Sequence, residues 1–247
     1  MSETGLLLYG FAALLVSILS SMAGGGGGFL MTPLLISLGL TPAQAVATGK
    51  YGGLAVSIGT LVGFRGHHFE DKKILYTLIG MATVIGLVAP HLITSLDPNL
   101  YKKLIGLFLI LLSIIILTKK LGRVHSEVSE KSKLAGLALV FCGFSLMAVF
   151  SSGLGVLVNV ALMGLVGLTS IESAIIKRSA QLLLNSLLVI GVTVAGLIAW
   201  RIVAVGAVGN LGGAYIGSSY ALKKGPEFVG KIMAALGFLS GAWLLLV

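Results

Sequence analysis

Lys50 and Arg178 are cationic residues that lie inside otherwise apolar stretches of the chain. A cation in the hydrocarbon of a membrane costs about 2.5–3.5 kcal/mol on insertion scales, and such residues usually serve a function. The two positions are separated by 128 residues and occupy matching places in the two halves of the sequence. Two buried cations in equivalent places predict a shared anionic ligand.

The same offset aligns several other residues, which indicates an internal duplication. The aligned pairs are Gly25 and Gly153, Gly27 and Gly155, Thr41 and Thr169, Pro98 and Pro226, and Lys103 and Lys231. Leucines also align, but leucines match by chance in any two apolar sequences. The repeat therefore rests on the glycine, threonine, proline and basic positions and on the order of the segments.

Polar side chains on the same two apolar stretches could complete an anion site. The candidates for contact with the substrate are Thr48, Lys50, Arg178, Gln181 and Asn185. Gln181 and Asn185 are four residues apart and would share a helix face with Arg178, where an amide N–H can donate to an oxyanion without adding charge. The alternative for the neutral residues is hydrogen bonding between helices. The alternative for the cations, including the neighbouring Lys177, is a long side chain that extends to the membrane surface.

A glycine- or serine-rich break precedes a half-length apolar run in each half. The breaks span 24–28 and 151–155, and the runs that follow them span 29–39 and 156–167. Five consecutive glycines are poor helix formers, and the freed N–H groups could bind an anion together with the positive end of the next helix. The predicted contacts are Gly25, Gly26, Gly27, Gly28, Ser151, Ser152 and Gly153. The alternative is that these small residues only allow helices to pack closely.

Composition identifies the chain as an integral membrane protein. Hydrophobic residues make up 57% of the sequence and charged residues only 10%, whereas about a quarter of residues are charged in an average globular domain. Most apolar stretches approach the ~20 residues that a helix needs to cross hydrocarbon. They span 6–22, 43–64, 74–96, 104–118, 134–150, 179–200, 202–222 and 232–247. We expect an all-α polytopic membrane protein with about eight transmembrane segments in two homologous halves.

The distribution of basic residues predicts how the two halves are oriented, because cytoplasmic loops carry an excess of lysine and arginine. If 29–39 continues in the direction of the first segment, the repeats are parallel and the basic residues divide nine to eight between the two sides. If 29–39 turns back, the repeats are inverted and the division becomes thirteen to four. We therefore expect inverted repeats with broken or re-entrant helices, and both termini outside. The predicted regions are a first membrane repeat (1–122), a cytoplasmic linker (123–133) and a second membrane repeat (134–247).

The sequence disfavours several other functions. The net charge of +9 fits basic cytoplasmic loops, so it does not indicate nucleic acid binding. The chain has no Gly-Lys-Ser/Thr phosphate loop and its acids lie almost all in predicted loops, so we expect neither an enzyme nor a bound cofactor. The group His67, His68, Glu70 and Asp71 lacks a second set of ligands, so we expect no metal site.

The opening of the chain combines a glycine-rich break, a proline between apolar residues, and a Gly-Leu-x-Pro-x-x-Ala-Val-Ala-Thr motif. These stand as GGGGGF at 24–29, TPLL at 32–35 and GLTPAQAVAT at 39–48. This pattern resembles the sulfite exporter TauE/SafE family, which is also grouped with the 4-toluene sulfonate uptake permeases. The resemblance covers nearly the whole chain, although the break at 151–155 is less glycine-rich than the family pattern.

The resemblance implies a multi-pass transporter of the inner membrane for sulfite, sulfonates or related organosulfur anions. We expect a secondary transporter that exports its substrate by alternating access between the two halves. Its expected partners are a small anionic substrate and the lipid bilayer, and a proton or a sodium ion could be coupled to transport. The alternatives are an uptake permease for other small organic anions and a non-transporting membrane scaffold or assembly subunit.

Overall fold

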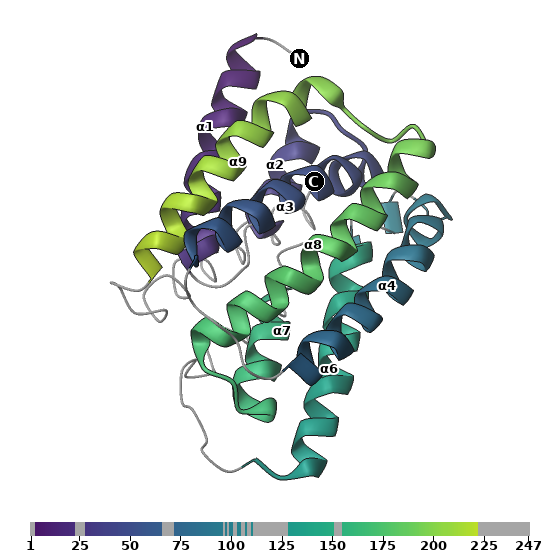
Figure 1. The fold of residues 1–247 in the computed structure, drawn as a ribbon. Coiled ribbons are helices and arrows are strands. Elements are labelled where there is room, and N and C mark those ends of the chain that lie inside the picture. Colours follow the sequence, from purple (N-terminus) through teal and green to yellow (C-terminus); the bar gives the residue numbers. More distant parts are fainter. Residues whose placement is uncertain are drawn as a thin grey trace.

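In a computed structural model of the 247-residue chain, the structure describes residues 3–22, 28–65, 72–95, 128–150 and 155–221, together with scattered positions from 97 to 110. These residues form helices and connecting turns, and no strand occurs among them (Figure 1). The all-helical class predicted from the sequence is therefore confirmed.

The described part of each half contains four α-helices. In the first half they are α1 (Glu3–Met22), α2 (Gly28–Ser37), α3 (Pro42–Gly63) and α4 (Lys72–Ser95). In the second half they are α6 (Glu130–Val149), α7 (Gly155–Ala161), α8 (Ser170–Val194) and α9 (Trp200–Ala221). A π-helical turn, η2 (Leu162–Val166), continues α7. Five described segments are long and apolar enough to cross a membrane: Glu3–Met22, Lys72–Ile93, Glu130–Val149, Ile171–Val194 and Trp200–Tyr220.

The offset of 128 residues also aligns the starts of the helices. Thr41 and Thr169 are the N-caps of α3 and α8, and each accepts a hydrogen bond from the backbone N–H three residues later. That residue is Gln44 in α3 and Glu172 in α8, and its side chain accepts from the backbone N–H of the cap in return. Such a capping box pairs two N–H groups that would otherwise lack partners at a helix start. The duplication is therefore visible in the local chemistry that starts these two helices.

The turns that lead into α3 and α8 also correspond. Gly39 and Gly167 both have positive φ, at 93° and 88°. This left-handed conformation is easily adopted by glycine, and it commonly ends a helix. A glycine of positive φ therefore follows the short helical segment of each half, and there the chain reverses into the long helix.

The contacts between helices show how the halves are oriented. α1 and α9 run in the same direction, because Glu3 pairs with Arg201 at their starts and Ser17 bonds Asn210 further along. α3 also runs parallel to α9, since Gly52 lies against Asn210 and Gly63 lies against Ser218. α1 and α3 therefore point the same way, and the short α2 between them is the returning segment. Figure 1 shows α1 starting at the top of the view and its counterpart α6 starting at the bottom, as in inverted repeats.

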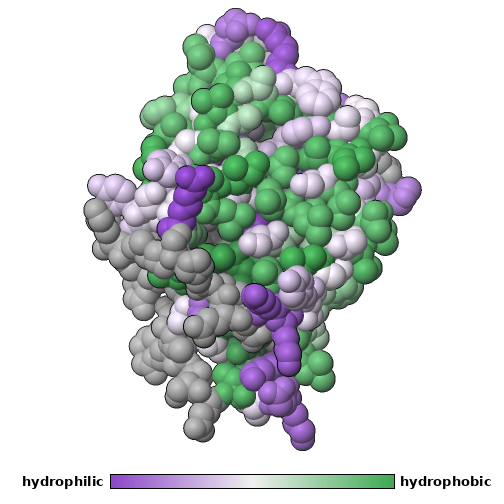
Figure 2. Space-filling model, viewed as in Figure 1, coloured by the Kyte–Doolittle hydropathy of each residue, from purple (hydrophilic) through white to green (hydrophobic). Residues whose placement is uncertain are grey.

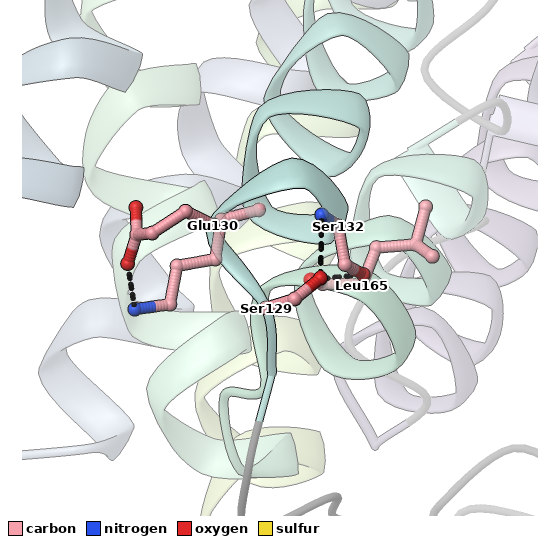
Figure 3. Close-up of polar contacts among 5 residues, drawn as sticks. Ser129, Glu130, Ser132 and Leu165 are labelled. Carbon is pink, nitrogen blue, oxygen red and sulfur yellow. Dashed lines mark hydrogen bonds and ion pairs between the residues drawn. The ribbon is translucent and has the colours of Figure 1, made fainter.

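The first turn of α6 is fixed to the end of η2 by polar contacts (Figure 3). Ser129 caps α6 by accepting from the N–H of Ser132, and the Ser132 hydroxyl donates to the Leu165 carbonyl oxygen at 3.1 Å. Lys133 and Glu130 form an exposed ion pair of 3.0 Å beside them. α6 thus begins at Glu130, inside the segment that the sequence assigned to the linker.

The surface is apolar across much of the helical bundle. Figure 2 shows a broad hydrophobic region over the middle of the visible face, with hydrophilic side chains at its top and bottom. Large apolar side chains such as Leu7, Val194 and Val208 are exposed. An exposed apolar belt of this kind is unfavourable in water and suits a lipid environment. The chain is therefore a multi-pass membrane protein, as its composition predicted.

Candidate functional site

Three cationic side chains are buried inside the helical bundle. Lys50 on α3 is 1% exposed, and Lys177 and Arg178 on α8 are 0% and 3% exposed. Their heads are therefore not extended to the surface, so the alternative of long side chains that reach the membrane interface is wrong for these residues. Burial of this extent requires hydrogen-bond partners for each charged group.

Lys50 joins the two halves of the protein. Its Nζ donates to the Met147 carbonyl oxygen at 2.7 Å. Met147 lies in the last turn of α6, where the final carbonyl groups have no partner within the helix. A cation at this end of a helix also interacts favourably with the helix dipole. The ammonium group of the first half is thus held by backbone of the second half.

Lys177 binds the backbone at the last residue of the second break, Gly155. Its Nζ donates to the Gly155 carbonyl oxygen at 3.2 Å, at the start of α7. A Cβ at Gly155 would lie 3.2 Å from the Met147 sulfur and 3.6 Å from the Lys177 Nζ. Glycine at this position therefore allows α6, α7 and the lysine to approach closely. Lys50 thus binds the backbone shortly before the break, at Met147, and Lys177 binds the backbone at the end of the break, at Gly155.

Arg178 is arranged differently from the two lysines. Its Nη1 donates to Gln181 Oε1 at 3.0 Å, as expected for residues that share a helix face. Its Nε and Nη2 have no hydrogen-bond partner among the described residues, and the same is true of Asn185 Nδ2. Seven residues make nearly two turns of helix, so Arg178 and Asn185 lie on one face of α8. The structure thus brings together Arg178 and Gln181, and it leaves N–H donors available on the same face.

Thr48 has a contact between helices. Its hydroxyl oxygen accepts a hydrogen bond from the Ala199 N–H at 3.2 Å, directly before α9 begins. Three residues further along α3, Tyr51 shares a hydrogen bond of 2.8 Å with Thr193 and packs edge-on against Trp200. This side of α3 therefore holds the turn between α8 and α9, which is the packing role that the sequence left open for Thr48.

The predicted glycine and serine contacts lie mostly outside the described residues. Gly25, Gly26, Gly27, Ser151, Ser152 and Gly153 belong to this group, as do the histidines and acids of 67–71. Gly28 is the first residue of α2. The anion cradle at the two breaks stays a prediction.

A cluster of neutral polar residues was not predicted as a unit. The Ser17 hydroxyl donates to Asn210 Oδ1 at 2.6 Å, and Ser21 and Thr60 share a hydrogen bond of 3.1 Å. All four side chains are buried where α1, α3 and α9 meet. Asn210 stands among glycines in an apolar stretch, and that pattern could have marked a polar contact between helices.

The chain is similar along nearly its whole length to known proteins. The family model described as "Sulfite exporter TauE/SafE" matches residues 9–244. A "Probable membrane transporter protein" of Haemophilus influenzae is 25% identical over 246 residues, which cover 96% of this chain and 92% of the relative. The "Probable membrane transporter protein YfcA" of Escherichia coli K12 is 24% identical over 244 residues, which cover 95% and 87%. No solved structure gives a significant match.

Proposed function

The chain belongs to the sulfite exporter TauE/SafE family, and on this premise we propose that it exports small sulfur-containing anions, such as sulfite or sulfonates, as a secondary transporter. Its relatives are described as probable membrane transporters, which supports transport rather than catalysis.

The buried cations are the observation that supports an anionic substrate. Lys50 and Arg178 are almost fully buried, and neither forms an ion pair with a carboxylate among the described residues. Buried charges are normally neutralised by a partner of opposite charge. A transported anion would supply this charge when it binds. We place the substrate near Arg178, Gln181, Asn185 and Lys50, with Thr48 and the two breaks as further predicted contacts.

The inverted arrangement of the halves supports alternating access. In many transporters of this kind, one repeat rocks against the other around a site near the middle of the membrane. Lys50 lies between the two halves, since α3 carries it and α6 supplies its partner. A site with residues from both halves would change its geometry when the halves move relative to each other. A proton or a sodium ion moving down its gradient could drive this movement.

Flux through the purified protein tests the proposal. Proteoliposomes loaded with sulfite, methanesulfonate or acetate would be diluted into substrate-free buffer, with and without a pH or sodium gradient. We expect release of the sulfur anions above the rate of protein-free vesicles, and a faster rate with one of the gradients. Release at the rate of empty vesicles for every anion would favour a scaffold role. Transport of acetate alone would favour a permease for other organic anions.

A further inference from the structure

The guanidinium group of Arg178 has one hydrogen-bonded side and one buried side without a hydrogen-bond partner among the described residues, here called the open side. Nη1 donates to Gln181 Oε1, whereas Nε and Nη2 have no hydrogen-bond partner among the described residues. The residue is only 3% exposed. About 90% or more of buried polar groups in proteins are hydrogen-bonded, and an unpaired buried donor is costly, more so when it is charged. The open side therefore requires an acceptor.

The two open donors form one edge of the guanidinium plane. The Nε–H points in the same direction as the nearer N–H of Nη2, so the edge presents two parallel donors. Two oxygen atoms attached to one central atom match this edge with two hydrogen bonds, as carboxylates and phosphates do. A halide ion offers a single centre, so two parallel N–H groups can only converge on it through bent, weaker hydrogen bonds.

We infer that the Nε and Nη2 edge of Arg178 binds the oxygen atoms of the transported anion side-on, and that Gln181 positions this edge. The inference rests on the proposed function, because it takes the transported substrate as the ligand. It adds that the substrate must carry at least two oxygens on one centre, as sulfite, sulfonates and carboxylates do.

Gln181 acts through Arg178 in this arrangement. Its side chain is 1% exposed, and its Oε1 accepts from Nη1 at 3.0 Å. This bond limits rotation of the guanidinium plane and leaves the opposite edge free. Lys50 and Lys177 differ, since both donate to backbone carbonyl groups. An ammonium group also lacks a fixed pair of parallel donors, so neither lysine could supply the same selectivity.

The test is the ratio of two affinities in the purified protein. Methanesulfonate and bromide carry the same charge, but only methanesulfonate offers several oxygens on one centre. Dissociation constants for both would be measured by calorimetry in wild type, Arg178→Lys, Gln181→Met and Lys131→Gln. Lys131 is exposed at the start of α6 and serves as the control.

We expect wild type and Lys131→Gln to bind methanesulfonate about tenfold to a hundredfold more tightly than bromide, the range for a hydrogen bond to a charged group. Arg178→Lys should lose most of this preference while its affinity for bromide changes little. Gln181→Met keeps the arginine and should show an intermediate ratio. A purely structural role of either residue would lower both affinities together and leave the ratio unchanged.

An unchanged ratio in Arg178→Lys would overturn the inference. If Arg178→Lys does not fold, two other results decide. A methanesulfonate-to-bromide ratio in Gln181→Met equal to that of the wild type would overturn the positioning role of Gln181. A ratio near one in the wild-type protein would overturn the side-on contact. These results leave the proposed function intact when the wild-type protein transports methanesulfonate. Absence of both binding and flux in wild type would overturn the inference and the proposed function together.

Discussion

At the scale of single residues, the sequence identified the buried cations but could not identify their partners. Lys50, Lys177 and Arg178 are visible because charges are rare in apolar stretches. The partner of Lys50 is a backbone carbonyl 97 residues away, and a backbone carbonyl has no signature in a sequence. The contact of Arg178 with Gln181 was within reach, because residues three apart lie on one helix face.

The cations lead to a prediction about substrate affinity. Arg178→Gln should weaken substrate binding about tenfold to a hundredfold, the range for a lost hydrogen bond to a charged group. Lys50→Gln should also weaken binding, because it removes a positive charge from the protein interior. Lys131→Gln should bind as wild type, since its side chain is exposed. Affinity would be measured by calorimetry on variants that elute as folded protein in gel filtration.

Wild-type affinity in both glutamine variants would contradict this prediction. The anion would then have to be bound by backbone N–H groups alone. Loss of affinity in Arg178→Gln but not in Lys50→Gln would assign Lys50 to holding α6 rather than to the substrate.

At the scale of elements, the hydrophobic pattern located the helices that the structure describes but placed the start of α8 too late; the predicted segments 104–118 and 232–247 lie almost entirely outside the described residues. The apolar stretch begins at 179, whereas α8 begins at Ser170, capped by Thr169. Lys177 and Arg178 interrupt the apolar pattern, so the stretch defined by hydrophobicity begins only after them. They remain within the helix because tertiary contacts pair Lys177 with the Gly155 carbonyl and Arg178 bonds Gln181. The π-helical turn η2 also had no signal in the sequence.

The contact between α1 and α9 leads to a prediction about stability. A Cβ at Gly213 would collide with the Leu14 carbonyl oxygen and lie 3.0 Å from the Ser17 Cβ. Gly213→Ala should therefore destabilise the protein by about 1–3 kcal/mol, as overpacking usually does. A Cβ at the neighbouring Gly212 would meet no atom of another helix within 4 Å, so Gly212→Ala should be neutral or stabilising by up to about 1 kcal/mol.

The thermal unfolding midpoint of both variants in one detergent measures this difference. Equal midpoints for Gly213→Ala and Gly212→Ala would show that α1 and α9 are packed less closely than the structure indicates. A lower midpoint for Gly212→Ala alone would show that α9 packs against α1 through the face that carries Gly212 and not through the face that carries Gly213.

At the scale of the whole molecule, the basic residues predicted the inverted arrangement, and the parallel contacts of α1, α3 and α9 agree with it. This succeeded because charge distribution reports the parity of membrane crossings. The packing of the two halves against each other was not predicted, because it depends on contacts between distant glycines. The side of the membrane on which each end lies stays a prediction.

Labelling of single cysteines tests that prediction. Thr4 and Lys131 are exposed near the starts of α1 and α6, which lie at opposite ends of the molecule in Figure 1. In a Cys142→Ala background, Thr4→Cys should react with an impermeant reagent added outside the cell, and Lys131→Cys only after the cytoplasmic side is opened. Reaction of both from one side would contradict the inverted arrangement. Reversed labelling would place the linker outside.

The way the helices pair has a consequence for each half of the chain. Among the described helices, the most extensive contacts each join one half to the other: α1 with α9, α3 with α9, α4 with α8 and α3 with α8. A single half, standing alone, would expose the faces that these contacts cover. A half-length chain would therefore cover these faces only by pairing with a second copy inserted in the opposite orientation in the same membrane.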